Sequence, residues 1–437
     1  MNIQMPEKVN RIIETLLAHG HEAYAVGGCV RDSLLGREAD DWDITTSASP
    51  YEVKELFRRT IDTGIQHGTV TVMFDKEGFE VTTYRIDGEY EDGRHPKEVL
   101  FTKKLEEDLK RRDFTINAMA YNKQTGMVDI FGGVEDLENK IIRCVGVAGD
   151  RFDEDALRIM RAFRFSAQLG FAIEENTKMA AAERAEHLKK ISAERIRVEL
   201  TKLLLSDHPD RLLWMQQNGI TRIVLPEFDA MLITEQKDGT YRYNVGEHTL
   251  RVIELAGCNG TWNKKELQVL KFAALLHHAD TGAKKAKEIM RRLKFDNETT
   301  DLVVRLVAAH NQYPELTDSR EENLAIMRHM MHHLGADLME YLWELQQADV
   351  LAEQIPATAH KAAALEERKK LHREVLQRGD CVSLKQLAVN GKDLISLGVK
   401  PGKEIGKVLE LLLEDVLTHP ENNSRELLLQ KAKNYTT

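Results

Sequence analysis

The pattern of hydrophobic residues changes once along the chain, close to residue 150. After that point, stretches rich in Leu, Ala, Glu, Lys and Arg repeat at helical spacing, as in residues 193–205 and 404–417. Before it, short apolar and β-branched runs predict strands at 23–26, 42–44, 69–74, 79–85, 118–121 and 127–130. We therefore expect an α+β fold, with an α/β unit over residues 1–148 followed by an elongated all-helical part.

The net charge of −10 disfavours a nucleic-acid partner at first sight, because phosphate binding rests on Lys and Arg. Residues 361–437 differ from the rest, with 14 Lys and Arg against 11 Asp and Glu, a local charge of +3. Such a segment can hold a phosphate backbone locally, although a solvated helical face has the same composition.

The cysteines and the termini place the chain in a broad class. Four cysteines lie far apart without a CxxC pair, so neither a disulfide framework nor a cysteine zinc site is expected. The N-terminus lacks the pattern of an export signal, and no segment approaches the ~20 apolar residues of a membrane helix. We expect a cytoplasmic protein with no membrane association and no obligatory protein partner.

An acidic pair follows a glycine-rich turn early in the chain. In a strand, residues two apart share a face, so Asp41 and Asp43 would point together while Trp42 and Ile44 take the other face. Asp40 falls out of phase. Two carboxylates on one face repel each other unless a cation lies between them, and Mg²⁺ is the natural candidate because it prefers oxygen ligands.

The glycines themselves suit a phosphate. Gly27 and Gly28 directly follow a predicted strand, where the backbone could approach a phosphate closely, and Arg31 could add a charged fork. Either motif alone is as readily a plain turn or a surface pair. Together, within seventeen residues, they favour metal-assisted phosphoryl or nucleotidyl transfer.

These motifs resemble those of the class II nucleotidyltransferases that act on tRNA, above all the bacterial CCA-adding enzymes. The resemblance includes GGCVRDSLLGREADDWDI (27–44), EEDLKRRDFTINAMA (106–120) and RFDEDALRIMRAFRFSAQLGF (151–171), and it resumes at residues 387–410. It implies template-independent addition of CCA to tRNA 3′ ends from CTP and ATP. Asp41 and Asp43 would hold Mg²⁺, and Arg112 would contact the sugar-phosphate part of the nucleotide.

The resemblance also implies a division into four segments. These are a catalytic nucleotidyltransferase head (1–148), a neck that recognises the base (149–206), a degenerate HD-like body (207–355) and a tail that binds tRNA (356–437).

Four charged residues are spaced by three, so we expect them to form a slanting stripe along one helix: Asp155, Arg158, Arg161 and Arg164. Asp155 beside Arg158 offers an acceptor next to a donor, which matches the pairing edges of cytosine and adenine but not those of guanine and uracil. With guanine or uracil both protein groups would be buried without a hydrogen bond, which would disfavour these bases by ~30-fold to ~10⁴-fold. Arg161 and Arg164 are then expected to point at the triphosphate.

Residues 86–100 look like a solvated loop, because glycines and a proline break any helix there. The family comparison implies that this loop assists the switch from C to A addition, so we expect complete CCA synthesis. An enzyme that adds only A or only C, or a poly(A) polymerase, is the alternative within the class.

Histidines in the second half of the chain suggest a different class of protein. His248, His277 and His310 resemble the histidine pattern of an HD-type phosphohydrolase. His278 stands where that site needs an aspartate, and Asp280 lies about 200° further around a helix. We therefore expect core or capping histidines. A non-catalytic RNA-binding protein is the remaining alternative, and the intact acid pair argues against it.

Glu80 stays open between two interpretations. It could be a third carboxylate near the metal ions, or an ordinary exposed strand glutamate.

Overall fold

The computed structural model describes residues 3–88, 99–234, 244–278, 282–353 and 358–435. It divides into two compact units, Met1–Asp229 and Ala230–Thr437, and each is described by itself. The predicted α+β class is confirmed, since the sheet lies in the first unit and the second unit, where described, is helical. The four-segment division stays a prediction.

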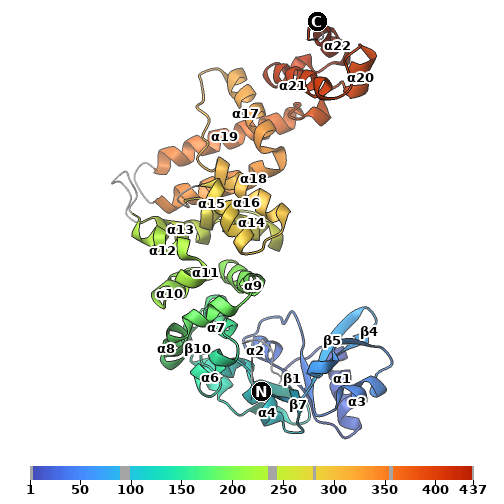
Figure 1. The fold of residues 1–437 in the computed structure, drawn as a ribbon, viewed down its shortest axis with the longest axis vertical. Coiled ribbons are helices and arrows are strands. Elements are labelled where there is room, and N and C mark those ends of the chain that lie inside the picture. Colours follow the sequence, from blue (N-terminus) through green and yellow to red (C-terminus); the bar gives the residue numbers. More distant parts are fainter. Residues whose placement is uncertain (1–2, 89–98, 235–243, 279–281, 354–357, 436–437) are drawn as a thin grey trace. The chain divides into compact units, whose positions relative to one another are not determined.

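The first unit contains a seven-stranded mixed sheet in its N-terminal part (Figure 1). Of its six neighbouring strand pairs, only β2 with β5 is parallel, and the other five are antiparallel. In sheet order the strands are β3 (Thr60–Gly64), β4 (Thr69–Phe74), β5 (Glu77–Thr83), β2 (Ile44–Thr46), β1 (Ala23–Val26), β8 (Met119–Asn122) and β9 (Gly126–Asp129).

Several predicted strands lie where the sequence places them, and one begins late. β1 and β4 have the predicted bounds. The run predicted at 42–44 becomes a strand only at Ile44, so Asp41 and Asp43 lie at the entrance to β2. The strand predicted at 79–85 is shifted towards the N-terminus, because β5 runs from Glu77 to Thr83.

Short helices flank the sheet: α1 (Glu7–Ala18), α2 (Gly28–Leu34), α3 (Pro50–Leu56), α4 (Leu105–Lys110) and α5 (Gly133–Glu138). Single turns of 3-10 helix lie at Ile65–His67 and Thr115–Asn117. One core cluster joins β1 and β8 to α4 through buried Tyr24, Val26, Leu109 and Ala120. This packing holds the segment after α4 close to the ends of β1 and β2.

The ends of the predicted loop at 86–100 are strands. β6 (Arg85–Asp87) pairs antiparallel with β7 (Val99–Phe101), so the loop contains fewer residues than predicted. Its centre, residues 89–98, lies outside the described residues.

Helices follow the sheet to the end of the first unit, as predicted. They are α6 (Ala148–Glu154), α7 (Leu157–Leu169), α8 (Glu175–Glu183), α9 (Ala193–Leu204), α10 (Arg211–Gln217) and α11 (Thr221–Val224), with a 3-10 segment at Ala185–Lys190. The next helix, α12 (Pro226–Ile233), begins in the first unit and ends in the second. Residues 141–142 (β10) and 172–173 (β11) add one small parallel pair. α7 packs on α9, which proves important for the site.

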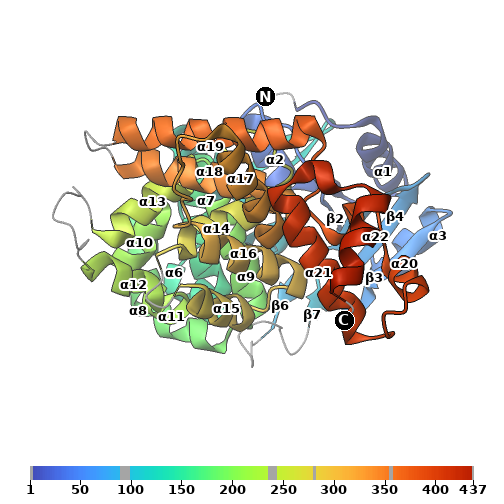
Figure 2. The same ribbon diagram turned by 90° about the horizontal axis from the view of Figure 1, so that it is seen from above.

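The second unit is built from α13 (Val245–Leu255), α14 (Lys264–Leu276), α15 (Ala283–Arg292), α16 (Asn297–Ala309), α17 (Arg320–Leu334), α18 (Ala336–Glu353), α19 (Thr358–Arg378), α20 (Gly391–Ser396), α21 (Lys403–Thr418) and α22 (Arg425–Asn434). Turns of 3-10 helix lie at Leu384–Gln386 and Pro420–Asn422. α18 and α19 run side by side in both views (Figures 1 and 2). Among the described residues, no helix is both long and apolar enough to cross a membrane.

Candidate active site

The glycine turn after β1 brings an arginine against the backbone. Gly27 has a φ of +84°, in the left-handed region that favours glycine, and it precedes α2, which begins at Gly28. A Cβ at Gly27 would lie only 2.9 Å from Nη1 of Arg112. The turn therefore needs glycine both for its conformation and to let Arg112 approach.

The acidic pair lies beside this turn. The carbonyl of Asp43 accepts a hydrogen bond from the backbone N–H of Val26 at 3.0 Å, which ties the entrance of β2 to the end of β1. Asp41 and Asp43 are exposed, Trp42 is half-buried and Ile44 is buried, which agrees with the predicted alternation even though the strand proper begins at Ile44.

Glu80 lies next to the acidic pair across the sheet. β2 and β5 are parallel with Ile44 opposite Val81, so the register one residue earlier sets Asp43 opposite Glu80. Register thus favours the interpretation of Glu80 as a neighbour of the acid pair, which the sequence left open.

The pKa values of Asp43 and Glu80 are both raised, by desolvation and by neighbouring negative charge. Desolvation raises the pKa of Asp43; the charge of Arg112 opposes this rise, and that of Asp41 adds to it. Desolvation also raises the pKa of Glu80, with further contributions from Asp43 and Asp41. Mutual repulsion of oxygen donors is the condition that a hard divalent cation relieves, so this donor set fits such an ion.

One nitrogen of the Arg112 guanidinium lacks a hydrogen-bond partner among the described residues. Its Nε is buried and makes no hydrogen bond to the part of the chain that the structure describes, while its Nη2 lies 3.6 Å from the buried carboxylate of Asp108. Asp108 is also held by Arg111 at 2.8 Å. Arg112 is therefore a cation fixed at the turn and close enough to act on Asp43.

Arg31 is already engaged. Its guanidinium donates to both oxygens of Asp32, at 2.9 and 2.8 Å, and to Oδ1 of Asn117 at 2.6 Å. The fork predicted for a phosphate is thus occupied by a carboxylate in this structure.

The predicted stripe of four residues on one helix is wrong in its first member. α6 ends at Glu154 and α7 begins at Leu157, so Asp155 lies in the junction, where its carboxylate caps the N–H of Leu157 at 3.0 Å. The junction breaks the helical phase that a spacing of three assumes.

Asp155 and Arg158 each have another partner. Arg195, on α9, donates to both carboxylate oxygens of Asp155, at 2.7 and 3.2 Å. Arg158 pairs with Glu154 at 2.6 Å and donates to the carbonyl of Arg111 at 3.0 Å. Sequence reasoning missed Arg195, because nothing in the spacing of residues 155 and 195 joins them.

Arg161 and Arg164, which lie on α7, pair with buried carboxylates. Arg161 lies 2.6 Å from Asp113, and Arg164 lies 2.8 Å from Glu199. Although burial opposes ionisation, the charges of Arg161 and Arg158 hold the pKa of Asp113 well below its usual value. The first pair fastens α7 to the segment that carries Arg112, and the second fastens α7 to α9.

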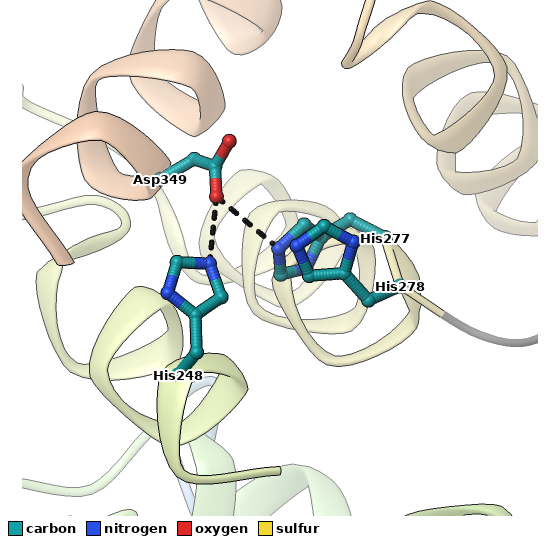
Figure 3. A group of neighbouring side chains, drawn as sticks. All are labelled: His248, His277, His278 and Asp349. Carbon is teal, nitrogen blue, oxygen red and sulfur yellow. Dashed lines mark hydrogen bonds and ion pairs between the residues drawn. The ribbon is translucent and has the colours of Figure 1, made fainter. Parts of the chain in front are cut away.

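A second group of ionisable side chains lies in the other unit (Figure 3). Potential ligand atoms of His248, His277, His278 and Asp349 all lie within 4.8 Å of one another. Among the described residues, these four side chains form a group that could hold a metal ion. The predicted capping role holds for His277, which follows α14, and for His310, which follows α16. The prediction did not foresee Asp349, and Asp280 lies outside the described residues.

Comparisons with known proteins cover nearly the whole chain. Family models match as "Poly A polymerase head domain" at residues 23–143, "Probable RNA and SrmB- binding site of polymerase A" at 170–232 and "tRNA nucleotidyltransferase domain 2 putative" at 264–432. A CCA-adding enzyme of Lactobacillus delbrueckii subsp. bulgaricus is 37% identical over 434 residues, which cover 96% of this chain and 95% of that enzyme. The chain belongs to the CCA-adding enzyme family.

Other relatives agree with this family. The CCA-adding enzyme of Lactiplantibacillus plantarum is 56% identical over 198 residues, 45% of this chain and 49% of that enzyme. The crystal structure of the Bacillus stearothermophilus CCA-adding enzyme in complex with CTP has a TM-score of 0.74 and 31% identity, covering 99% of this chain and 98% of that one. The Thermotoga maritima enzyme complexed with tRNA, at 21% identity and a TM-score of 0.61, shares the fold. The nucleotidyltransferase family uses divalent metal ions.

Proposed function

We propose that this chain adds and repairs the 3′-terminal CCA of tRNA, using CTP and ATP without a nucleic-acid template and releasing pyrophosphate. The observation that carries the proposal is the register of β2 and β5, which sets Asp43 beside Glu80, with Asp41 and Arg112 around them. It is supported by full-length relatives named as CCA-adding enzymes. The described site contains the carboxylate, arginine and glycine types that nucleotidyl transfer needs.

Asp41 and Asp43 would hold Mg²⁺, with Glu80 beside them. The bound ion would supply Lewis-acid activation of the terminal tRNA hydroxyl and neutralise charge on the leaving pyrophosphate. Arg112, fixed against the Gly27 turn, offers its guanidinium to the sugar-phosphate part of the nucleotide. Gly28 opens α2 next to this position, and Arg31 steadies the turn through Asn117.

Asp155 and Arg158 would choose the base from the junction between α6 and α7. In the described structure their polar atoms are satisfied by Arg195 and Glu154. Reading a base therefore requires exchange of at least part of these protein hydrogen bonds for bonds to cytosine or adenine. The remaining donors of Arg161 and Arg164 would face the triphosphate once the nucleotide is bound.

The four segments then have separate tasks. The head (1–148) does the chemistry and the neck (149–206) chooses the base, while the body (207–355) and tail (356–437) hold tRNA by shape and backbone. The tail carries the local charge of +3 noted above. Such an enzyme works in the cytoplasm, where tRNA is matured, and needs no membrane.

The test uses purified protein, a tRNA transcript that lacks CCA, and each labelled nucleoside triphosphate in turn. The proposal expects CMP to be incorporated from CTP alone and AMP only after it, with neither GMP nor UMP. Poly(A) synthesis on the same transcript would favour the polymerase alternative instead.

A further inference from the structure

A cluster of three imidazoles and one carboxylate in the second unit has no part in the proposed reaction. It joins three helices that pack pairwise: His248 comes from α13, His277 and His278 follow α14, and Asp349 lies on α18. His248 and His277 are each only 2% exposed, and Asp349 is 9% exposed. Figure 3 shows His248 and His277 directed at one carboxylate oxygen of Asp349, with the ring of His278 beside that of His277.

The hydrogen bonds around the cluster fix which ring nitrogens carry lone pairs. Nδ1 of His277 lies 2.6 Å from the carbonyl of Ala274, so it must donate, and in the neutral ring Nε2 is left as an acceptor. Nδ1 of His310 is held in the same way by the carbonyl of Val307. Ligand histidines in metal sites are oriented by such bonds from their second nitrogen.

When the His277 ring is neutral, two acceptors face each other inside the protein. Nε2 of His277 lies 3.5 Å from Oδ1 of Asp349, is buried, and makes no hydrogen bond within the described residues. Nε2 of the neighbouring His310 is also buried and without such a bond. A lone pair aimed at a carboxylate in a dry site is unfavourable unless a cation lies between them.

The spacing suits a small transition-metal ion. Four ligands around Zn²⁺ at about 2.0–2.1 Å lie about 3.3–3.4 Å apart when the geometry is tetrahedral. Oδ1 of Asp349 already lies 2.8 Å from Nε2 of His248 and 3.5 Å from Nε2 of His277, distances that bracket this value. Imidazole favours zinc and its neighbours, whereas Mg²⁺ favours oxygen alone.

We propose that His248, His277, His278 and Asp349 bind one Zn²⁺ ion as a closed, structural site within the second unit. The four protein ligands leave no open position for water, which separates this site from a hydrolytic centre. Binding displaces the proton that His248 shares with Asp349 and links α13, α14 and α18 through the metal. The site is independent of nucleotide addition by the first unit.

The experiment measures metal content of the full chain without a histidine tag, expressed with added zinc and dialysed. The proposal expects one zinc ion per chain, and a visible absorption band of four-coordinate Co²⁺ when cobalt replaces it. Asp349→Asn and His278→Gln should each weaken zinc binding by at least about 100-fold, because loss of even an outer-shell partner costs 10–100-fold. His333→Gln, which changes an exposed histidine of α17, is the matched control and should bind like the parent.

Thermal melting gives a second readout. Chelation should lower the Tm of the parent and of His333→Gln, and leave the Tm of His278→Gln unchanged. Should Asp349→Asn fail to fold, His278→Gln still decides, since His278 is only half-buried. A parent without zinc and without a cobalt band, or ligand variants that keep as much zinc as the parent, would overturn the proposal. If zinc were bound at Asp41 and Asp43 instead, the ligand variants would keep as much zinc as the parent.

Discussion

Arg195 holds the carboxylate of Asp155 through two hydrogen bonds, although 40 residues separate them in the chain. Asp155 is therefore presented from the junction between α6 and α7 by a side chain of α9, rather than by its place on a helix. Base choice should then depend on Arg195 as a positioning residue.

Asp155→Ala should admit UTP or GTP and slow addition from CTP and ATP, because the acceptor of the proposed donor–acceptor pair is gone. Arg195→Ala should lower discrimination between CTP and UTP by about 10–100-fold, the worth of one charge-assisted hydrogen bond. Arg195→Lys keeps the charge but loses the fork, so it should restore part of the discrimination.

The measurement is the ratio of kcat/KM for CTP to that for UTP in each variant. A purely structural role of Arg195 would lower both values equally. An unchanged ratio in Asp155→Ala would remove the protein side-chain template from the account.

The acid pair should be essential for the reaction and dispensable for folding. Asp41→Ala or Asp43→Ala should lower kcat by about 10³-fold or more, since charge stabilisation by a held metal is worth several kcal/mol. Both side chains are exposed, so circular dichroism and Tm should hardly change. Glu80→Gln should slow addition less severely, because Glu80 flanks the pair.

Asp40→Ala is the control for this set, since Asp40 is exposed and out of phase. It should retain most of the activity in the same primer-extension assay. Equal loss from all three aspartates would mean that the assigned side-chain phase is incorrect.

Gly27→Ala should disable the site through Arg112. The new Cβ would meet Nη1 of Arg112 at 2.9 Å, and a φ of +84° with a ψ of −129° adds about 1–3 kcal/mol of backbone strain. Gly20→Ala is the control, because Gly20 also has a positive φ, of +83°, but nothing lies within 4 Å of the added carbon.

Urea unfolding and steady-state kinetics on both glycine variants separate the two effects. Both variants should lose stability through their positive φ, while KM for the nucleotide should rise in Gly27→Ala alone. Parallel kinetic losses in the two would show that Arg112 is not displaced by the added methyl group.

The ion pair of Asp113 with Arg161 should make stability depend on pH. Because the pKa of Asp113 is lowered in the folded state, its ionised form stabilises the fold above its unfolded value of about 3.9. That contribution is lost as the pH falls below this value, through the folded pKa.

Asp113→Asn should therefore cost about 3–5 kcal/mol at pH 7, since it leaves Arg161 without its buried partner, and less at acid pH. Asp153→Asn, which changes an exposed carboxylate of α6, should cost no more than about 1 kcal/mol. Urea midpoints at pH 7 and pH 3 measure both. A difference in unfolding free energy between the parent and Asp113→Asn that is larger at pH 3 than at pH 7 would contradict the account.

Local patterns in the sequence predicted local structure well. The bounds of β1 and β4 and the helices at α9 and α21 follow from period and composition. The i, i+2 spacing of Asp41 and Asp43 predicted that they are exposed together, although the strand itself begins one residue after Asp43.

Contacts between distant segments could not be predicted in this way. Arg195 meets Asp155 because α9 packs on α7, and Asp349 meets His248 across 101 residues because α18 packs on α13. Glu80 comes beside Asp43 only through the register of a parallel strand pair. Packing and register depend on the whole core, and no short-range spacing encodes them.

The central claim is that one site adds both C and A, and two tRNA transcripts test it most directly. One transcript lacks the whole CCA and the other lacks only the terminal A, and CTP and ATP are supplied separately. The account predicts CMP on the shorter transcript from CTP alone, and AMP on the longer one from ATP alone. It also predicts that a chain lacking residues 88–95 keeps C addition and loses the final A. Failure of the intact chain to incorporate CMP into the shorter transcript, with AMP still added to the longer one, would contradict it.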